Sequence, residues 1–187
     1  MSDGKSLQDE GRKLYHGGQY EEAAAKLVEA QQAFVAANDQ ANAAECANDR
    51  GVCWRQAAKW AEATAAFAEA RSMFQALNDA KGEGQVVGNI AALADSQNDK
   101  DHAADLYLEA IDLLEKAGAK DLAKDTYTAL SRLCLKRGNF MGAISAYDSG
   151  LEEGDKPNMM QRVVRRILGG STKPPKATEK KDELNSS

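Results

Sequence analysis

Small and apolar side chains recur along this chain at the spacing of amphipathic helices, and the same pattern returns every 40 residues. Four sets of positions keep this step: Tyr20, Trp60, Lys100 and Phe140; Ala23, Ala63, Ala103 and Ala143; Gly11, Gly51, Ala91 and Ser131; and Ala30, Ala70, Ala110 and Gly150. A fixed period of this length is typical of a solenoid, in which each unit buries its apolar face against its neighbours.

Each 40-residue unit contains two helical stretches separated by a short break. The pattern predicts eight helices, at about residues 4–17, 20–37, 40–57, 60–77, 80–97, 100–117, 120–137 and 140–153. The second helix of a unit is expected to stop at Asn38, Asn78 or Gly118, because asparagine and glycine accept the left-handed conformation that ends a helix. Asp39 and Asp79 come next and are predicted to cap the following helix.

The composition agrees with a stack of helices, since 43% of the residues are apolar but only 6% are aromatic, and alanine is very common. We therefore predict an all-α solenoid over residues 4–153, built from helix pairs at 4–38, 39–78, 79–118 and 119–153. Residues 154–168 are predicted to form a shorter helix that caps the end of the solenoid. Residues 169–187 are rich in Gly, Ser, Thr, Pro and Lys and are predicted to be a disordered basic tail.

The repeated positions resemble those of the tetratricopeptide-repeat family. The family's signature sites are filled by the sets above, apart from Lys100, and by two more: Leu14, Trp54 and Cys134; and Leu27, Phe67, Tyr107 and Tyr147. The 40-residue period is longer than the common 34 and is similar to the long-helix subgroup of kinesin light chains and polarity adaptors. The resemblance implies a right-handed α-α superhelix. Armadillo units need a third helix for which there is no room, and HEAT repeats lack this spacing of small and aromatic residues.

The third unit departs from this pattern. Lys100 stands where an aromatic residue is expected, and the preceding helix contains Gly82, Gly84 and Gly88. Each glycine costs about 0.5–1 kcal/mol against alanine, so this unit is predicted to be the least stable and is a candidate hinge. The alternative is that close packing of the backbone requires these glycines.

In the family, the concave face binds partners and is lined mainly by the first helix of each unit. Residues three or four apart share a helical face, which allows the inward-facing side chains to be projected. The predicted partner-binding residues are Lys5 and Arg12 in the first unit, Glu45, Asn48, Asp49 and Arg55 in the second, Gln85, Asn89 and Asp95 in the third, and Asp125, Arg132 and Lys136 in the fourth. Their mixture of amides and charges of both signs suits an extended peptide.

The expected function is therefore that of a non-catalytic adaptor that binds a peptide or protein segment in its groove. The alternative is a structural subunit that docks in a larger assembly through its convex face or its ends. Acids at Asp49 and Asp125 argue against the clamp with which co-chaperone members of the family hold a chaperone's C-terminal carboxylate.

The charge distribution narrows the class of partner. Residues 1–153 hold 16 Lys and Arg against 25 Asp and Glu, whereas residues 154–187 hold 8 against 4. An acidic solenoid argues against nucleic acid and suits a partner of basic character. The chain's own basic end is one such candidate, which would occlude the groove. Membrane contact is not expected, because the predicted cap is only about ten apolar-faced residues long.

The sequence contains no glycine-rich phosphate loop, nucleophile motif or set of metal ligands, so we expect neither catalysis nor a cofactor. Three cysteines (Cys46, Cys53 and Cys134) and a polar N-terminus without a signal peptide suggest reduced thiols and a cytoplasmic protein. Cys46 and Cys53 lie seven residues apart on one predicted helix, roughly 10 Å, which is too far for a disulfide.

Overall fold

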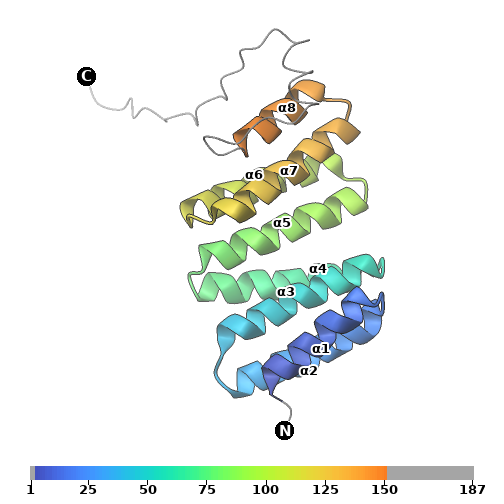
Figure 1. The fold of residues 1–187 in the computed structure, drawn as a ribbon, viewed down its shortest axis with the longest axis vertical. Helices are drawn as coiled ribbons and strands as arrows, with labels where there is room; N and C mark the ends of the chain where they lie inside the picture. The colour runs from blue at the N-terminus through green and yellow to red at the C-terminus, as the bar shows by residue number, and fades with distance from the viewer. Residues whose placement is uncertain (1–2, 151–187) are drawn as a thin grey trace, which may run out of the picture.

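The computed structural model describes residues 3–150 and folds them into eight α-helices (Figure 1). They are α1 (Gly4–His16), α2 (Tyr20–Ala36), α3 (Gln40–Gln56), α4 (Trp60–Ala76), α5 (Ala80–Ser96), α6 (Lys100–Lys116), α7 (Lys120–Lys136) and α8 (Phe140–Ser149). The all-α prediction is confirmed, and seven of the eight helices end within one residue of their predicted bounds. The predicted end of the last helix at 153 is wrong. Helix α8 ends at Ser149 because Gly150, a poor helix former, takes the C-cap position.

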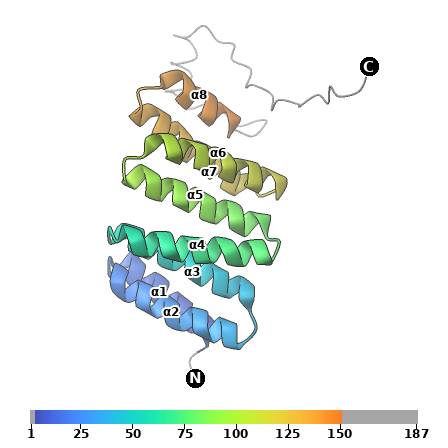
Figure 2. The ribbon, with the colours of Figure 1, turned by 180° about the vertical axis from the view of Figure 1, so that it is seen from behind.

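The helices form two layers. Helices α1, α3, α5 and α7 lie nearer the viewer in Figure 1, and α2, α4 and α6 lie nearer the viewer from behind in Figure 2. Each helix packs against the helices before and after it, and within the odd-numbered layer α3 also contacts α5 and α5 contacts α7. Lateral contacts of this kind draw the odd-numbered helices together, so this layer forms the inner, concave side of the stack.

The two helices of a pair cross at close range through a small residue on the first helix. A Cβ atom added at Gly51 would lie 2.5 Å from the ring of Phe67, and one added at Gly11 would lie 3.0 Å from Leu27. In the last pair, the Ser131 hydroxyl donates a hydrogen bond of 2.7 Å to the Ala143 carbonyl. Gly11 and Gly51 therefore each face a large side chain that stands 16 residues further along the chain.

The aromatic residues at the starts of the second helices differ in how far they are buried. Tyr20 and Trp60 are half-buried, but the Phe140 side chain is 67% exposed. Phe140 begins α8, which belongs to the last helix pair of the described residues.

Two of the three glycines in the third unit are explained by packing. A Cβ atom at Gly82 would lie 2.2 Å from the Phe74 ring, and one at Gly84 would lie 2.8 Å from Leu114. At Gly88 the nearest atom is 3.8 Å away, which leaves room for a side chain. Close approach between neighbouring helices thus accounts for Gly82 and Gly84, while the hinge remains a prediction.

The turns between the helices share one conformation. A residue with positive φ stands in every turn at a spacing of 20 residues: Gly18, Asn38, Ala58, Asn78, Asn98, Gly118 and Gly138. The predicted stops at Asn38, Asn78 and Gly118 are confirmed, as are the caps, since Asp39 and Asp79 accept from the backbone N–H groups of Asn42 and Gly82. Regular turns keep successive helices at the same spacing.

Two arginines on the convex side each tie three helices together. Arg50 of α3 donates to Gln31 of α2 at 2.8 Å and forms an ion pair with Glu69 of α4. Arg71 of α4 binds Glu83 of α5 at 3.1 Å and Glu109 of α6. These hydrogen bonds and ion pairs hold each helix pair in a fixed position against the next.

All three cysteines are buried with free thiols, as predicted. None of the helices in residues 3–150 has the length and apolar character needed to cross a membrane. The predicted capping helix (154–168) and disordered tail (169–187) lie outside the described residues, as does the last part of the solenoid predicted to reach residue 153.

Among the turns of residues 3–150, Ala58 is the one residue with positive φ, 56°, that is neither glycine nor asparagine. Its Cβ atom makes this conformation unfavourable by about 1 kcal/mol, and glycine removes that cost. We expect Ala58→Gly to raise the free energy of unfolding by about 1 kcal/mol in urea denaturation. Ala57→Gly is the matched control, because φ at Ala57 is −77° and glycine brings no relief there. Equal effects of the two substitutions would contradict this interpretation.

Candidate functional site

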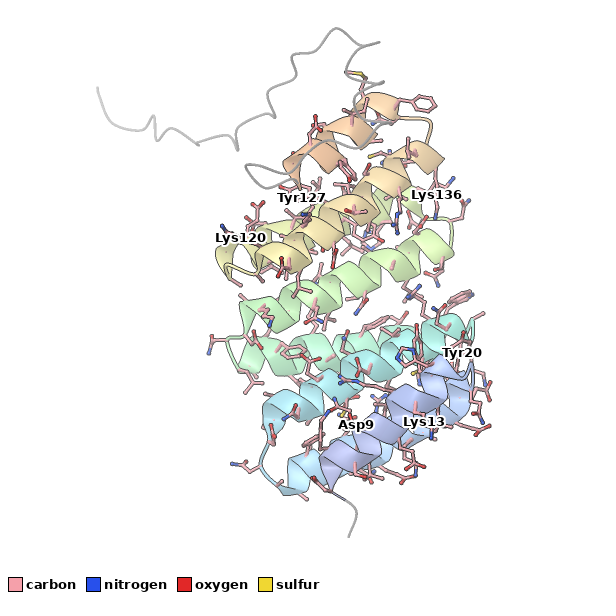
Figure 3. The ribbon with its side chains drawn as sticks, in the orientation of Figure 1. Asp9, Lys13, Tyr20, Lys120, Tyr127 and Lys136 are labelled. Carbon is pink, nitrogen blue, oxygen red and sulfur yellow. The ribbon has the colours of Figure 1, made fainter. Side chains whose placement is uncertain are left out.

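The concave face carries the side chains of the four odd-numbered helices. The predicted partner-binding residues are distributed as follows: Lys5 and Arg12 on α1; Glu45, Asn48, Asp49 and Arg55 on α3; Gln85, Asn89 and Asp95 on α5; and Asp125, Arg132 and Lys136 on α7. Lys120 and Lys136 mark the two ends of α7 in Figure 3 and so show the width of this face. One end holds the amino termini of the odd-numbered helices and the other holds their carboxyl termini.

Three contacts between predicted residues connect the odd-numbered helices in order. Arg12 donates to Asp49 from Nε at 3.0 Å and from Nη2 at 2.8 Å, which joins α1 to α3. The Asn89 amide donates to the Asn48 oxygen at 2.9 Å, which joins α5 to α3. Lys136 binds Asp95 at 2.5 Å and joins α7 to α5. We call these three contacts the inner ladder.

The predicted residues differ in how far their side chains are exposed. Lys5 pairs with Asp9 on its own helix at 2.7 Å and is exposed, as are Asp125 and Arg132. Asn48 is only 3% exposed, so its side chain supports the neighbouring helix rather than the open surface. Glu45, Gln85 and Arg55 are half-buried.

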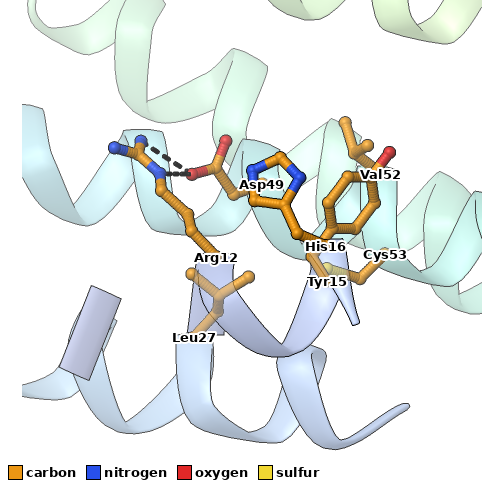
Figure 4. A pocket seen from close by; sticks show the side chains of 7 residues that line it. All are labelled: Arg12, Tyr15, His16, Leu27, Asp49, Val52 and Cys53. Atoms are coloured by element: carbon orange, nitrogen blue, oxygen red, sulfur yellow. Dashed lines mark hydrogen bonds and ion pairs between the residues drawn. The ribbon is translucent and has the colours of Figure 1, made fainter. Parts of the chain in front are cut away.

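A first pocket of about 200 Å³ opens beside the ion pair of Arg12 and Asp49, between α1, α2 and α3 (Figure 4). It is lined by Arg12, Tyr15, His16, Leu27, Asp49, Val52 and Cys53. Leu27, Val52 and Cys53 make its wall mainly apolar, and the ion pair forms a charged rim. Burial raises the pKa of the Cys53 thiol to about 12, so the thiol stays protonated and acts as an apolar surface. The pocket has room for one medium-sized apolar side chain.

A second, wider pocket of about 660 Å³ lies between α3, α5 and the turn that joins α6 to α7. It is lined by Glu45, Lys81, Gln85, Gly118, Ala119, Lys120, Asp121 and Leu122. Glu45 and Gln85 were predicted as binding residues, but Lys81, Lys120 and Asp121 were not. Projection along one helical face missed them because they stand at the starts of helices, where the fold of the preceding turn decides which way they face.

Two acidic side chains on α3, those of Glu45 and Asp49, are half-buried. Burial raises the pKa of Glu45, and the negative charge of Asp49 one turn away raises it further. Burial also raises the pKa of Asp49, and the ion pair with Arg12 opposes that rise without cancelling it. The groove therefore holds partly buried carboxylates whose charged form would be stabilised by a cationic group of a partner.

Among residues 3–150, no three His, Cys, Asp or Glu side chains are grouped so that they could hold a metal ion. What the arrangement offers is a row of hydrogen-bonding and charged groups with an apolar pocket at one end. Such a surface can recognise a chain by its side chains and its backbone.

Comparisons with known proteins bear on the fold. No family model matches the chain, and no curated protein matches its sequence. Among solved structures, the chain is similar to BtubC (BKLC) from P. vanneervenii, with a TM-score of 0.65 and 18% identity. The match covers 95% of this chain and 70% of that one. BtubC is a kinesin-light-chain-like protein of the tetratricopeptide type, so the predicted superhelical repeat fold is confirmed.

Glu45 should make stability depend on pH. Its carboxyl holds a proton more tightly in the folded chain than in the unfolded one, so its charge destabilises the fold at pH 7, and this cost disappears as pH falls through its raised pKa. We expect Glu45→Gln to raise the Tm at pH 7 and the gain to shrink toward pH 4. Thermal denaturation across this range tests it, with Glu62→Gln on an exposed part of α4 as the control. A gain that does not vary with pH would contradict it.

Proposed function

We propose that this protein is a non-catalytic interaction scaffold that binds a peptide or protein segment along its concave face. The observation that carries the proposal is the inner ladder, which links all four odd-numbered helices and places charged and amide groups side by side. A surface whose side chains are already held in place loses little conformational entropy when a partner binds. The repeat scaffold itself is consistent with a role in protein interaction.

The two pockets support an extended ligand. They lie at different places on the concave side, one beside α1 and the other beside the turn before α7. A segment that spans them would place an apolar side chain in the first pocket and polar groups in the second. Extended peptides are recognised in this way, with backbone bonds supplying affinity and pockets supplying specificity.

Charge supports a partner with basic groups. The described solenoid is acidic, and the half-buried acids Glu45 and Asp49 lie in the groove where a cation would offset the cost of their burial. The same acidity disfavours nucleic acid, which would need a basic stripe. The buried, unpaired cysteines support a reducing compartment, and we place the protein in the cytoplasm.

A structural role through the end of the solenoid is the second candidate, and one observation favours it. Leu135 is 49% exposed and Phe140 is 67% exposed, although the equivalents of Leu135 in earlier units are half-buried beneath the next helix pair. A protein that stacked on this end would cover both side chains.

Crosslinking mass spectrometry of the native complex shows whether the partner lies in the groove or on the convex face. Lys81, Lys120 and Lys136 lie on the odd-numbered helices, whereas Lys26 and Lys116 lie on the even-numbered ones. A groove-bound partner should crosslink to the first set, and a partner on the convex face should crosslink to the second. The crosslinked partner then serves as the ligand for affinity measurements.

We expect Asp125→Lys and Arg132→Glu each to weaken binding of that partner about tenfold, because both are exposed groove residues outside the inner ladder. Asp105→Lys, an equal charge change on the exposed side of α6, is the control and should leave affinity within about twofold. Calorimetric titration measures all three. Loss of binding only in a Leu135→Ser/Phe140→Ser variant would instead support docking at the end.

Asp49 needs a different test, since its reversal alone would break the ion pair with Arg12. We expect the exchange Arg12→Asp/Asp49→Arg to keep the pair, and with it a near-native Tm, while inverting the charges beside the first pocket. Partner affinity should then fall about tenfold. A stable exchange variant that binds as well as the natural protein would show that this pocket is not used.

A further inference from the structure

Three large apolar side chains are exposed on the last helix pair of the described solenoid, at the end of the stack marked by α8 in Figure 1. They are Leu135, next to the last residue of α7, and Phe140 and Met141, the first two residues of α8. Only residues 137–139 separate the two helices, so these side chains stand within one short stretch of the fold. We call the three side chains the end patch.

The repeat shows what lies against the position of Leu135 in earlier units. Tyr15 holds this position in the first unit, and its hydroxyl accepts from Gln56 of α3 at 3.2 Å. Asp95 holds it in the third unit and binds Lys136 of α7 at 2.5 Å. In both units this position therefore contacts the carboxyl end of the following first helix.

Met141 stands at a position with the same role. Glu21, its equivalent in the first unit, pairs with Lys59 at 2.9 Å, and Asp101, its equivalent in the third, pairs with Arg137. Lys59 and Arg137 both lie in the turn that comes after the following first helix. A helix that followed α8 in the same way would place its carboxyl end against the end patch.

The end patch differs in chemistry from the same positions in those units. A phenol and three carboxylates form hydrogen bonds and ion pairs with the next unit there, whereas leucine and methionine offer neither. Covering an apolar side chain is favourable when the covering surface is apolar as well, because both surfaces then leave water. The element that covers the end patch should therefore be apolar on that side, unlike the first helices before it.

Residues 157–168, which lie outside the described residues, have a sequence of this kind. Five apolar residues recur at the spacing of one helical face: Met160, Val163, Val164, Ile167 and Leu168. The three arginines between them fall on the opposite side. Pro157 and Gly169 are typical of the first position of a helix and of the residue just after its end.

The length of this segment matches the length of α8. Helix α8 has 10 residues, whereas α2, α4 and α6 have 17 each. At 1.5 Å per residue, α8 spans about 15 Å and a helix over residues 157–168 would span about 18 Å. Residues 151–156 are long enough to connect two antiparallel helices. A helix that ran back along α8 would thus bring its carboxyl end to the first residues of α8, where the end patch lies.

We propose that residues 157–168 form a helix that packs antiparallel to α8 and covers the end patch with Ile167 and Leu168. This contact gives the capping segment predicted from the sequence a place and an orientation, with its arginines facing water. A partner that stacked on this end of the solenoid would first have to displace the segment. The end is therefore closed to docking while the segment is in place, and the groove is not affected.

Methyl NMR on the full chain tests the contact directly. We expect nuclear Overhauser effects between the Met141 methyl group and the methyl groups of Ile167 or Leu168. A sample that mixes chains labelled only at methionine with chains labelled only at isoleucine and leucine should lose these effects, because the contact lies within one chain. Effects that persist in the mixed sample would assign the end patch to a second copy. That result, or the absence of any effect in the uniformly labelled chain, overturns the proposal.

A cycle of substitutions gives an independent measure. Met141→Ser and Ile167→Ser should each lower the Tm by about 2–4 °C, and the double variant should lose little more than either, because residues in contact are not additive. Ile167→Ser combined with Leu108→Ser, at an exposed leucine of α6, is the matched control, and its two shifts should add. Additive losses for Met141 and Ile167 contradict the contact.

Discussion

In the first two helix pairs a large side chain of the second helix packs directly onto a glycine of the first, and the close crossing of the helices depends on this contact. At Gly51 there is no space for even a Cβ atom in front of the Phe67 ring, and Gly11 faces Leu27 almost as closely. Because interiors are densely packed, a change of one methyl group here would push the helices apart. The same crossing in successive pairs keeps the repeat regular, which brings residues 40 apart into line on the concave face.

That alignment produces the inner ladder. Arg12 reaches Asp49, and Asp95 reaches Lys136, because each stands about one repeat from its partner on the neighbouring helix. These ion pairs are partly exposed, and pairs of this kind contribute only about 0–1 kcal/mol. The apolar crossings therefore supply the stability, and the ladder holds polar groups in position. At Arg55 the ladder lacks an acceptor, and the buried Nε–H group of this arginine has no hydrogen-bond partner among the described residues.

Helical projection from the sequence predicted a set of inward-facing residues, because the phase of the repeat determines which side of each first helix faces the groove. It did not distinguish an open position from a covered one. Asn48 projects toward the groove, yet the next odd-numbered helix covers it and binds its amide. Nor did projection find Lys81 or Asp121, since the wider pocket exists only where a turn between two pairs folds beside α3 and α5.

The sequence by itself determined the number of helices described, the ends of seven of them, the class of fold and the faces on which polar residues gather. These features depend on the local spacing of apolar residues, on capping residues such as Asp39, and on the 40-residue period of the sequence. The tertiary structure alone decided which groups are paired and which are left over. Arg55 and Asp95 occupy the same position in their repeats, but only Asp95 meets an opposite charge. Whether a side chain is paired depends on which residue of the neighbouring helix lies opposite it. The spacing of residues within one repeat does not determine that residue.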